Sequence, residues 1–131
     1  MKALETNIEA PLNYYVTDHF MYSDFLCPCC DRIKIVPGMY RHIALLDRMA
    51  GDFGDIIVTS GYRCEAHNRE VGGSPRSWHM LFATDITVDG ADRDTLNELY
   101  KLAIDLDFGG IGLYESHLHL DIRPEKVRWR V

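Results

Sequence analysis

The sequence lacks the features that mark several classes of protein. It has no run of about 18 apolar residues, so no membrane-spanning helix is expected. It has no dense basic run, and its formal net charge of −6 disfavours non-specific binding to nucleic acid or to anionic membranes. No internal repeat or low-complexity linker divides the chain. We therefore expect a single domain over residues 1–131, a monomer with no nucleic-acid or membrane partner.

The N-terminal segment MKALETNIEAPLNYYV also lacks the apolar centre of a secretory signal peptide. This pattern predicts a protein that is made in the cytoplasm and either stays there or leaves by another route. A mature form cut from a longer precursor fits the same pattern.

Cysteine is scarce, and three of the four cysteines stand together in the segment CPCC. Cys27 and Cys30 have the CxxC spacing of a metal site or of a redox pair. Cys64 could complete a zinc site of four cysteines, including Cys29, once the chain folds. Disulfides or free buried thiols are the alternative, and a single CxxC pair favours that alternative.

Apolar residues make up 47% of the chain, enough to form a core, and their spacing predicts the elements. Helical spacing indicates one helix from about Pro37 to Gly51 and a second from Asp92 or Asp94 to about Leu106. Apolar or alternating runs indicate strands at 55–59, 83–88, 111–114, 117–122 and 127–131. The strand at 55–59 is expected to be buried. The remaining segments read as irregular, with an extended run at 14–16 and one helical turn at 66–71. The chain is therefore expected to be an α+β domain with a small, mostly antiparallel sheet and two main helices.

The segment SHLHLDI is the most informative part of the chain. Alternate side chains of a strand share a face, so His117, His119 and Asp121 point one way and the apolar residues between them point into the core. Two imidazoles and a carboxylate in a row indicate a metal or catalytic site. A solvated polar face is the alternative, although such faces more often carry Lys, Glu, Thr or Ser.

The segment SWHMLFATDI supplies a second pair of candidate ligands. His79 lies in a predicted loop, and Asp85 lies in an otherwise apolar strand, where a carboxylate is costly unless it is paired or bound to a metal. A hydrogen bond from Asp85 to a loop is the alternative. Catalytic zinc usually takes three protein ligands of these types and activates a water, whose proton a nearby carboxylate or imidazole accepts.

Arg63 directly follows a predicted strand and a Gly turn. A guanidinium in this place can clamp a substrate carboxylate or carbonyl. A surface arginine paired with an acid is the alternative and is the commoner case.

These segments together resemble a known family. SGYRCEAHNREVGGSPRSWHMLFATDI resembles the core motif of the zinc D-alanyl-D-alanine carboxypeptidases, which belong to a wider group with lysostaphin and the hedgehog signalling domain. GGIGLYESHLHLDIRP resembles the closing strands of that family, and HFMYSDFLCPCC resembles the Cys-bearing entry segment of small phage and prophage members. The resemblance covers roughly residues 18–130 and implies a hedgehog/DD-peptidase-like fold.

The resemblance also implies roles for matching residues. It assigns Zn²⁺ as the cofactor, with His79, Asp85 and His119 as its ligands. His117 matches the imidazole that assists at the transition state.

Substrate contacts and the proton acceptor follow from the same resemblance. Arg63 matches the arginine that holds the substrate, and Ser77 matches a serine that supports the substrate or the loop. Glu115 matches the acid that accepts the proton, and Asp121 is the alternative acceptor because it shares a strand face with His119.

The spacer between the first two implied ligands departs from the family pattern. Five residues without a glycine separate His79 from Asp85, whereas the family usually has six with a glycine halfway. A shorter spacer without glycine has less access to positive φ, so we expect another loop path or a distorted site.

The resulting hypothesis is a zinc peptidase that hydrolyses peptidoglycan stem peptides, as a carboxypeptidase or an endopeptidase. The resemblance to phage members implies release to the cell wall by a phage-type lysis route. A metal-binding module without activity is one alternative, favoured by the short spacer. A redox or metal-storage protein built on CPCC is another, which leaves the histidines and aspartates unexplained.

Overall fold

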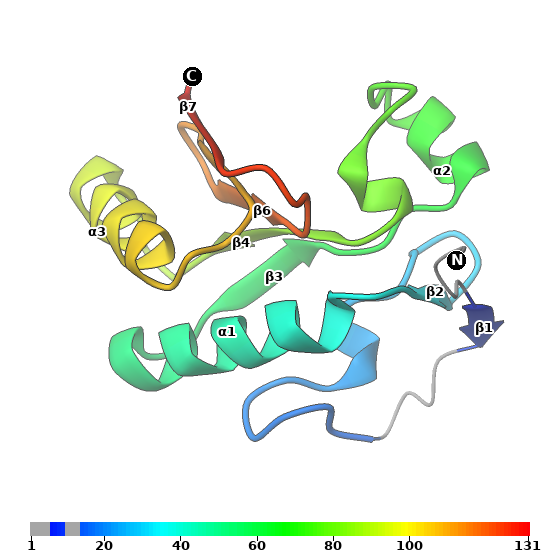
Figure 1. The fold of residues 1–131 in the computed structure, drawn as a ribbon, viewed down its shortest axis with the longest axis horizontal. Coiled ribbons are helices and arrows are strands. Elements are labelled where there is room, and N and C mark those ends of the chain that lie inside the picture. The colour runs from blue at the N-terminus through cyan, green and yellow to red at the C-terminus, as the bar shows by residue number, and fades with distance from the viewer. Residues whose placement is uncertain (1–5, 10–13) are drawn as a thin grey trace.

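The computed structural model describes residues 6–9 and 14–131 and has a five-stranded sheet at its centre (Figure 1). The strand order is β3-β4-β6-β5-β7. All neighbouring strands are antiparallel except β5 and β7, which run parallel. The strands are β3 (Ile57–Ser60), β4 (Ala83–Thr87), β5 (Gly110–Leu113), β6 (Leu118–Asp121) and β7 (Val127–Arg130).

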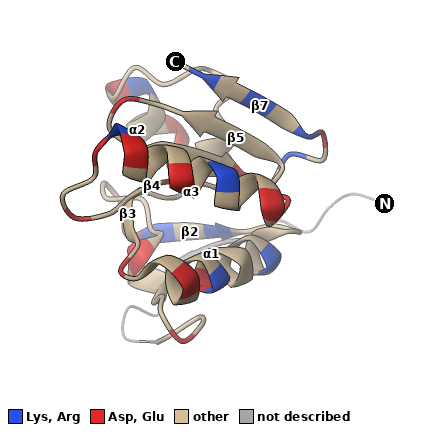
Figure 2. Cartoon of the chain, turned by 90° about the vertical axis from the view of Figure 1, so that its left-hand side faces the viewer, with Lys and Arg blue, Asp and Glu red and all other residues tan. Residues whose placement is uncertain are grey.

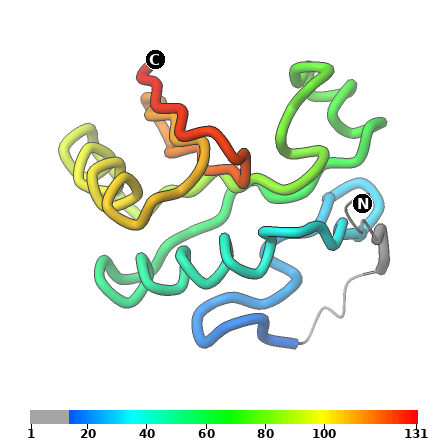
Figure 3. The backbone as a smooth tube through the Cα atoms, viewed as in Figure 1, coloured from blue at the N-terminus to red at the C-terminus, as the bar shows by residue number. Residues whose placement is uncertain are grey.

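Two long helices supply most of the helical packing surface. They are α1 (Met39–Phe53) and α3 (Arg93–Asp105), whose paths Figure 3 traces in cyan and yellow. The apolar stripes of both helices join Ile86, Leu118 and Leu120 of the sheet in one buried cluster. The charged residues of α3 lie on the side that faces away from the sheet (Figure 2). This arrangement confirms the predicted α+β fold with a mostly antiparallel sheet and two main helices.

Capping residues and glycines account for the boundaries of the helices. Asp92 caps α3, and its Oδ1 accepts hydrogen bonds from the backbone N–H and the hydroxyl of Thr95, at 2.8 and 2.7 Å. The helix α1 runs past the expected end at Gly51 and stops at Gly54, whose φ of 104° is accessible to glycine and breaks the helical path. The predicted helical turn at 66–71 is the short helix α2 (Glu65–Glu70).

The strand prediction for 55–59 was partly wrong. The strand β3 begins at Ile57, whose side chain is 43% exposed, and only Ile56 before it is buried. The reason is that β3 lies at the edge of the sheet and pairs with a strand on one side only. Its apolar side chains are therefore not covered by neighbours as they would be in a central strand.

The prediction that residues 1–24 are irregular was also partly wrong. The strand β1 (Thr6–Glu9) pairs antiparallel with β2 (Arg32–Ile35), and a 3₁₀ turn, η1, spans Tyr22–Asp24. Both strands have four residues, too few for a clear alternation signal. Within the expected extended run at 14–16, Tyr15 makes only an isolated bridge to Met21, and residues 10–13 lie outside the described chain. Among the described residues, no helix has the length and apolar character needed to cross a membrane.

Candidate metal centre

Strand pairing brings the three predicted ligands together. Asp85 of β4 and His119 of β6 are direct partners in the antiparallel register, and His79 lies in the 3₁₀ turn η2 (Trp78–Met80) just before β4. Asp85 Oδ1 lies 3.3 Å from His79 Nε2 and 3.1 Å from His119 Nδ1. One ligand atom from each residue lies within 4.8 Å of the others. The expected cluster of two imidazoles and a carboxylate is therefore present.

The short spacer still leaves His79 and Asp85 side by side, with 3.3 Å between Nε2 and Oδ1. The chain leaves η2 at Leu81 and enters β4 at Ala83 without any glycine. The Ser77 hydroxyl accepts a hydrogen bond from the His79 N–H at 3.2 Å and caps this turn. A 3₁₀ turn thus brings His79 beside Asp85 without a glycine in the spacer.

His79 is oriented by the loop before α2. Its Nδ1 lies 2.7 Å from the carbonyl oxygen of Gly61, which can only accept, so Nδ1 carries the proton. Nε2 then faces Asp85 Oδ1, to which it donates when the ring carries a second proton and beside which its lone pair is free to bind a metal ion when it does not. A metal-binding histidine commonly gives its second ring N–H to a carbonyl or carboxylate in this way.

His119 is oriented from its other side by Asp121. Its Nε2 lies 2.8 Å from Asp121 Oδ2, which leaves Nδ1 directed at Asp85. Asp121 is buried and also accepts hydrogen bonds from the Gly110 N–H and from the backbone and guanidinium of Arg123. Both oxygens of Asp121 are thus engaged in holding its neighbours.

Arg123 extends this network across the open face of the sheet. Its guanidinium lies 5.5 Å from the ring centre of Trp78 and 5.1 Å from that of Trp129. These cation–π contacts hold Arg123 against Asp121. Arg123 was not predicted from the sequence as a site residue. The alternation that groups His117, His119 and Asp121 extends to position 123 and could have indicated it. Trp129 had no comparable signal, because its place depends on the parallel pairing of β5 with β7.

The network sets the charge state of the site without metal. Burial alone would raise the pKa of Asp85, but hydrogen bonds from His119 and His79 hold that pKa well below its usual range. Burial acts to lower the pKa of His119, but hydrogen bonds to Asp121 and Asp85 outweigh it and raise the pKa. The doubly protonated His119 ring is therefore favoured, with its Nδ1–H donated to Asp85 and its Nε2–H donated to Asp121. A divalent cation must displace the Nδ1 proton, so metal affinity should increase with pH.

The donor set and its spacing fit zinc. Zinc takes imidazole nitrogen and carboxylate oxygen at about 2.0–2.2 Å, which places tetrahedral ligand atoms about 3.4 Å apart. The two distances to Asp85 Oδ1, 3.3 and 3.1 Å, are close to this value. The group can therefore hold a metal ion with little movement of the side chains, and its three ligands are the number typical of catalytic zinc.

His117 lies at the rim of the group. Its ring stacks on Tyr114 with centroids 4.6 Å apart, and its Nε2 lies 3.9 Å from Asp85 Oδ1. Its Nδ1 lies 3.0 Å from the Ser116 hydroxyl, and burial lowers the pKa of His117. The ring is therefore neutral and fixed in orientation near neutral pH.

Arg63 lies beside the turn that carries His79. Its backbone N–H donates to the His79 carbonyl oxygen at 2.8 Å, and its guanidinium donates to Asn68 Oδ1 at 2.9 Å. The half-buried side chain is thus held by α2 close to the candidate metal centre.

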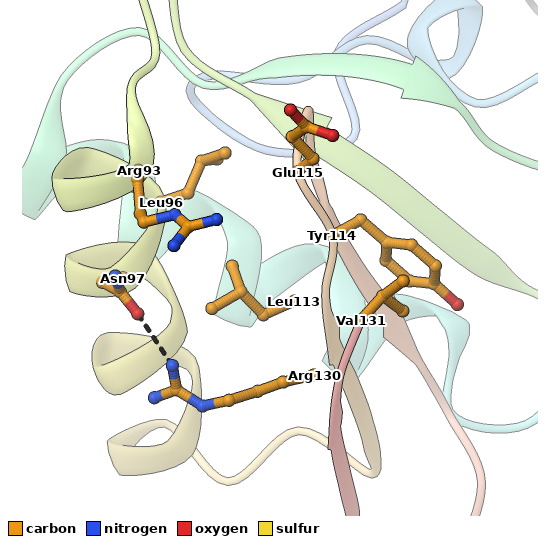
Figure 4. A pocket seen from close by; sticks show the side chains of 8 residues that line it. All are labelled: Arg93, Leu96, Asn97, Leu113, Tyr114, Glu115, Arg130 and Val131. Atoms are coloured by element: carbon orange, nitrogen blue, oxygen red, sulfur yellow. Dashed lines mark hydrogen bonds between the residues drawn. The ribbon is translucent and has the colours of Figure 1, made fainter.

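Glu115 does not join the three clustered ligands. It is exposed and lies on the wall of a cavity of about 720 Å³ between α3 and the ends of β5 and β7. Figure 4 shows this cavity with Arg93 and Leu96 on α3 opposite, while the Tyr114 ring points to the other side of the strand. A hydrogen bond from Arg130 to Asn97 closes its lower part.

A second cavity, of about 770 Å³, borders the His79 turn itself. Ser77, Trp78 and Met80, which flank His79, line it together with the cationic residues Lys34 and Arg76. The cavity thus offers a binding space next to the candidate metal centre.

Comparison with family models gives a match to the family described as Peptidase M15 over residues 18–121. Comparison with curated proteins and with solved structures gave no significant match. The matched region covers most of the chain and includes the three clustered ligands. The chain therefore belongs to the peptidase M15 family, a group of metallopeptidases.

Proposed function

We propose that the protein is a zinc-dependent peptidase that hydrolyses the stem peptides of peptidoglycan. The observation that carries the proposal is the group of His79, Asp85 and His119, in which each imidazole has its second ring nitrogen held by Gly61 or Asp121. This arrangement fixes the orientation of both rings before metal binds, as catalytic zinc sites require.

The protein residues would hold and tune the ion. His79 Nε2, His119 Nδ1 and one Asp85 oxygen are the ligand atoms, and Asp121 keeps His119 in the required tautomer. When bound, zinc supplies Lewis acidity toward water and toward a peptide carbonyl.

His117 would stabilise charge on the scissile carbonyl. We assign Nδ1 as the acceptor of a hydrogen bond from the Ser116 hydroxyl, 3.0 Å away, which places the proton on Nε2, the nitrogen that faces the ligand group. A neutral Nε2–H can donate to an oxygen that becomes negative in the transition state. Stacking on Tyr114 limits the rotation of the ring.

We propose Glu115 as the proton acceptor, with Asp121 as the alternative. The Asp121 oxygens already accept hydrogen bonds from Gly110, Arg123 and His119, which favours a holding role for that residue. Glu115 lies in the hairpin between β5 and β6, two residues before His117, and its exposed carboxylate is open to water.

Charge near the centre suits a peptide with free carboxylates. Arg63 lies beside His79, and the adjoining cavity is lined by two cationic residues, Lys34 and Arg76, and one acid, Glu65. Stem peptides carry such carboxylates, so these cations support the choice of substrate. Release to the wall by a phage-type route is part of the proposal and rests on the resemblance to phage members, and a monomeric state is a separate part of the proposal.

The test uses zinc-loaded protein and purified muropeptides, with products identified by mass spectrometry. Release of D-Ala would show a carboxypeptidase, and internal cleavage would show an endopeptidase. Glu115→Gln is expected to lower kcat by about 10²- to 10⁴-fold with zinc content unchanged. His119→Ala should lose both zinc and activity, and His19→Ala should lose neither, because His19 contacts Asp47 away from the ligand group.

Zinc-loaded wild-type protein that binds muropeptides without cleaving them would overturn the proposal. That result would favour the inactive metal-binding module. The observation that favours this second function is the position of Glu115 on the wall of a separate cavity, away from the three clustered residues.

A further inference from the structure

The four cysteines converge from two distant parts of the chain. Cys27, Cys29 and Cys30 lie in the turn between η1 and β2, and Cys64 lies directly before α2. Their four sulfur atoms all lie within 4.8 Å of one another. The Cys29 sulfur is 3.5 Å from that of Cys27 and 3.2 Å from that of Cys64. This cluster lies outside the His/Asp/His group and is not used by the proposed reaction.

The sulfur spacing fits a shared metal ion better than a disulfide. A disulfide requires sulfur atoms about 2.05 Å apart, whereas all four cysteines are free thiols. Zinc binds thiolate at about 2.3 Å, so tetrahedral sulfur ligands lie about 3.8 Å apart. The spacing in the cluster therefore needs only small side-chain rotations to reach that geometry.

Backbone N–H groups beside two of the four sulfurs can stabilise negative charge on them. The Cys64 N–H donates to the Cys27 sulfur at 3.5 Å, and the His67 N–H donates to the Cys64 sulfur at 3.4 Å. The CxxC turn is closed by hydrogen bonds from Asp31 N–H to the Cys27 carbonyl and from Cys27 N–H to the Arg32 carbonyl. N–H donors to sulfur stabilise thiolates and hold metal ligands in place.

We propose that Cys27, Cys29, Cys30 and Cys64 bind a second, structural zinc ion. Four sulfur ligands close the coordination sphere, which is the arrangement of structural zinc and leaves no open position for chemistry. Thiolate-only sites also favour zinc over the hard divalent cations.

The second ion would position the loop that orients His79. The Tyr62 N–H donates to the Phe25 carbonyl at 2.8 Å, and a Cβ on Gly61 would lie 2.6 Å from the same oxygen. The segment from Phe25 to Cys30 thus packs tightly on the segment from Gly61 to Cys64. A zinc ion shared by both segments would hold the Gly61 carbonyl in place for His79 Nδ1.

The test counts metal in reduced, zinc-supplemented protein by elemental analysis. Wild-type protein should hold about two zinc ions per chain, and His119→Ala should keep about one. Cobalt-loaded His119→Ala should show the near-ultraviolet sulfur-to-cobalt charge-transfer absorption of a thiolate site. Cys29→Ser and Cys64→Ser should lose that absorption, and His19→Ala should still bind about two ions.

Disulfide formation or free thiols would overturn the proposal. Disulfides would appear as a mass loss of two hydrogens per bridge in unreduced protein, with no zinc retained by His119→Ala. Free thiols would appear as rapid alkylation of all four cysteines in zinc-loaded protein. Misfolding of the cysteine variants would not prevent the test. The zinc counts of wild type and His119→Ala, with the cobalt spectrum, are enough to show whether the cysteines bind a metal ion. The His119→Ala count and the cobalt spectrum depend neither on the first metal site nor on peptidase activity, so failure of the proposed function would leave them unchanged.

Discussion

Asp121 holds His119 from the side of the ring opposite Asp85. Asp121→Asn replaces one acceptor oxygen by an amide donor, so the side chain cannot accept from both His119, now bound at Oδ2, and the Gly110 N–H, now bound at Oδ1. We expect zinc affinity to fall by about 10- to 100-fold, measured by competition with a chromophoric chelator. Asp107→Asn is a matched control, because Asp107 is exposed and has a φ of 65°, which asparagine tolerates.

The opposite result would assign Asp121 a different role. If Asp121→Asn kept its zinc affinity but lost turnover, Asp121 would be the proton acceptor and Glu115 would not. The two residues that the sequence left as alternatives are separated by this measurement together with Glu115→Gln.

His42 should make the stability of the metal-free protein depend on pH. Its ring is buried beside Phe82 and Phe108, with Nε2 2.9 Å from the Thr84 hydroxyl, and burial lowers its pKa from 6.5 to about 3. Between these values the unfolded state binds a proton that the folded state does not. The contribution of His42 is therefore fully present above about pH 6.5 and is lost as the pH falls, by about 1.4 kcal/mol per pH unit.

Urea unfolding of chelated protein between about pH 4.5 and 6.5 measures this dependence. His42→Gln cannot titrate, so the slope of its unfolding free energy against pH should be smaller than that of wild type by about 1.4 kcal/mol per unit. Equal slopes for the two proteins would show that the folded protein protonates His42 as easily as the unfolded chain does.

At the residue scale, the strand period of two was enough to predict part of the site. It grouped His119 with Asp121, and the structure confirms their contact. It could not show that the Gly61 carbonyl holds His79, because a backbone acceptor has no sequence signal and the contact spans two loops.

At the scale of elements, the segment before α2 is tightly constrained. A Cβ on Gly61 would lie 2.6 Å from the Phe25 carbonyl oxygen and 2.7 Å from its Cα, both backbone atoms that cannot rotate away. Gly61→Ala should therefore lower the free energy of unfolding by about 1–3 kcal/mol and weaken zinc binding through His79. Urea unfolding and chelator competition measure the two effects.

Gly51→Ala provides the matched control in α1. Nothing lies within 4 Å of a Cβ at this helical position, so alanine should raise the free energy of unfolding by about 0.5–1 kcal/mol. A neutral effect of Gly61→Ala, with zinc affinity retained, would show that the two loops can separate without disturbing His79.

Long periodic elements were predictable, and short or long-range ones were not. The helices α1 and α3 carry several turns of apolar periodicity, which defines them without tertiary context. The strands β1 and β2 have only four residues each, and the edge position of β3 and the parallel pairing of β7 depend on partners far along the chain. The exposure of Ile57 and the contact of Trp129 with the site therefore required the structure.

At the scale of the whole molecule, the two candidate metal sites share one loop. Gly61 holds His79 by its carbonyl, and Cys64, three positions later, belongs to the cysteine cluster. Both ions would bind only the folded chain, so each should raise its stability. A site occupied at about 100 times its Kd adds about 2.7 kcal/mol, or on the order of 10 °C in Tm for a chain of this size.

Chelation of wild-type and variant proteins separates the two contributions. In thermal melts of zinc-loaded protein under reducing conditions, excess chelator should lower the Tm of wild type by about twice as much as that of His119→Ala, on the order of 20 °C against 10 °C. The variant still responds because the cysteine cluster keeps its ion, and the two sites contribute additively if the shared loop does not couple them. A His119→Ala melt that chelator leaves unchanged would mean that His79, Asp85 and His119 hold the only stabilising ion. A larger than additive loss in wild type would instead show that the cysteine site and the His79 loop stabilise one another.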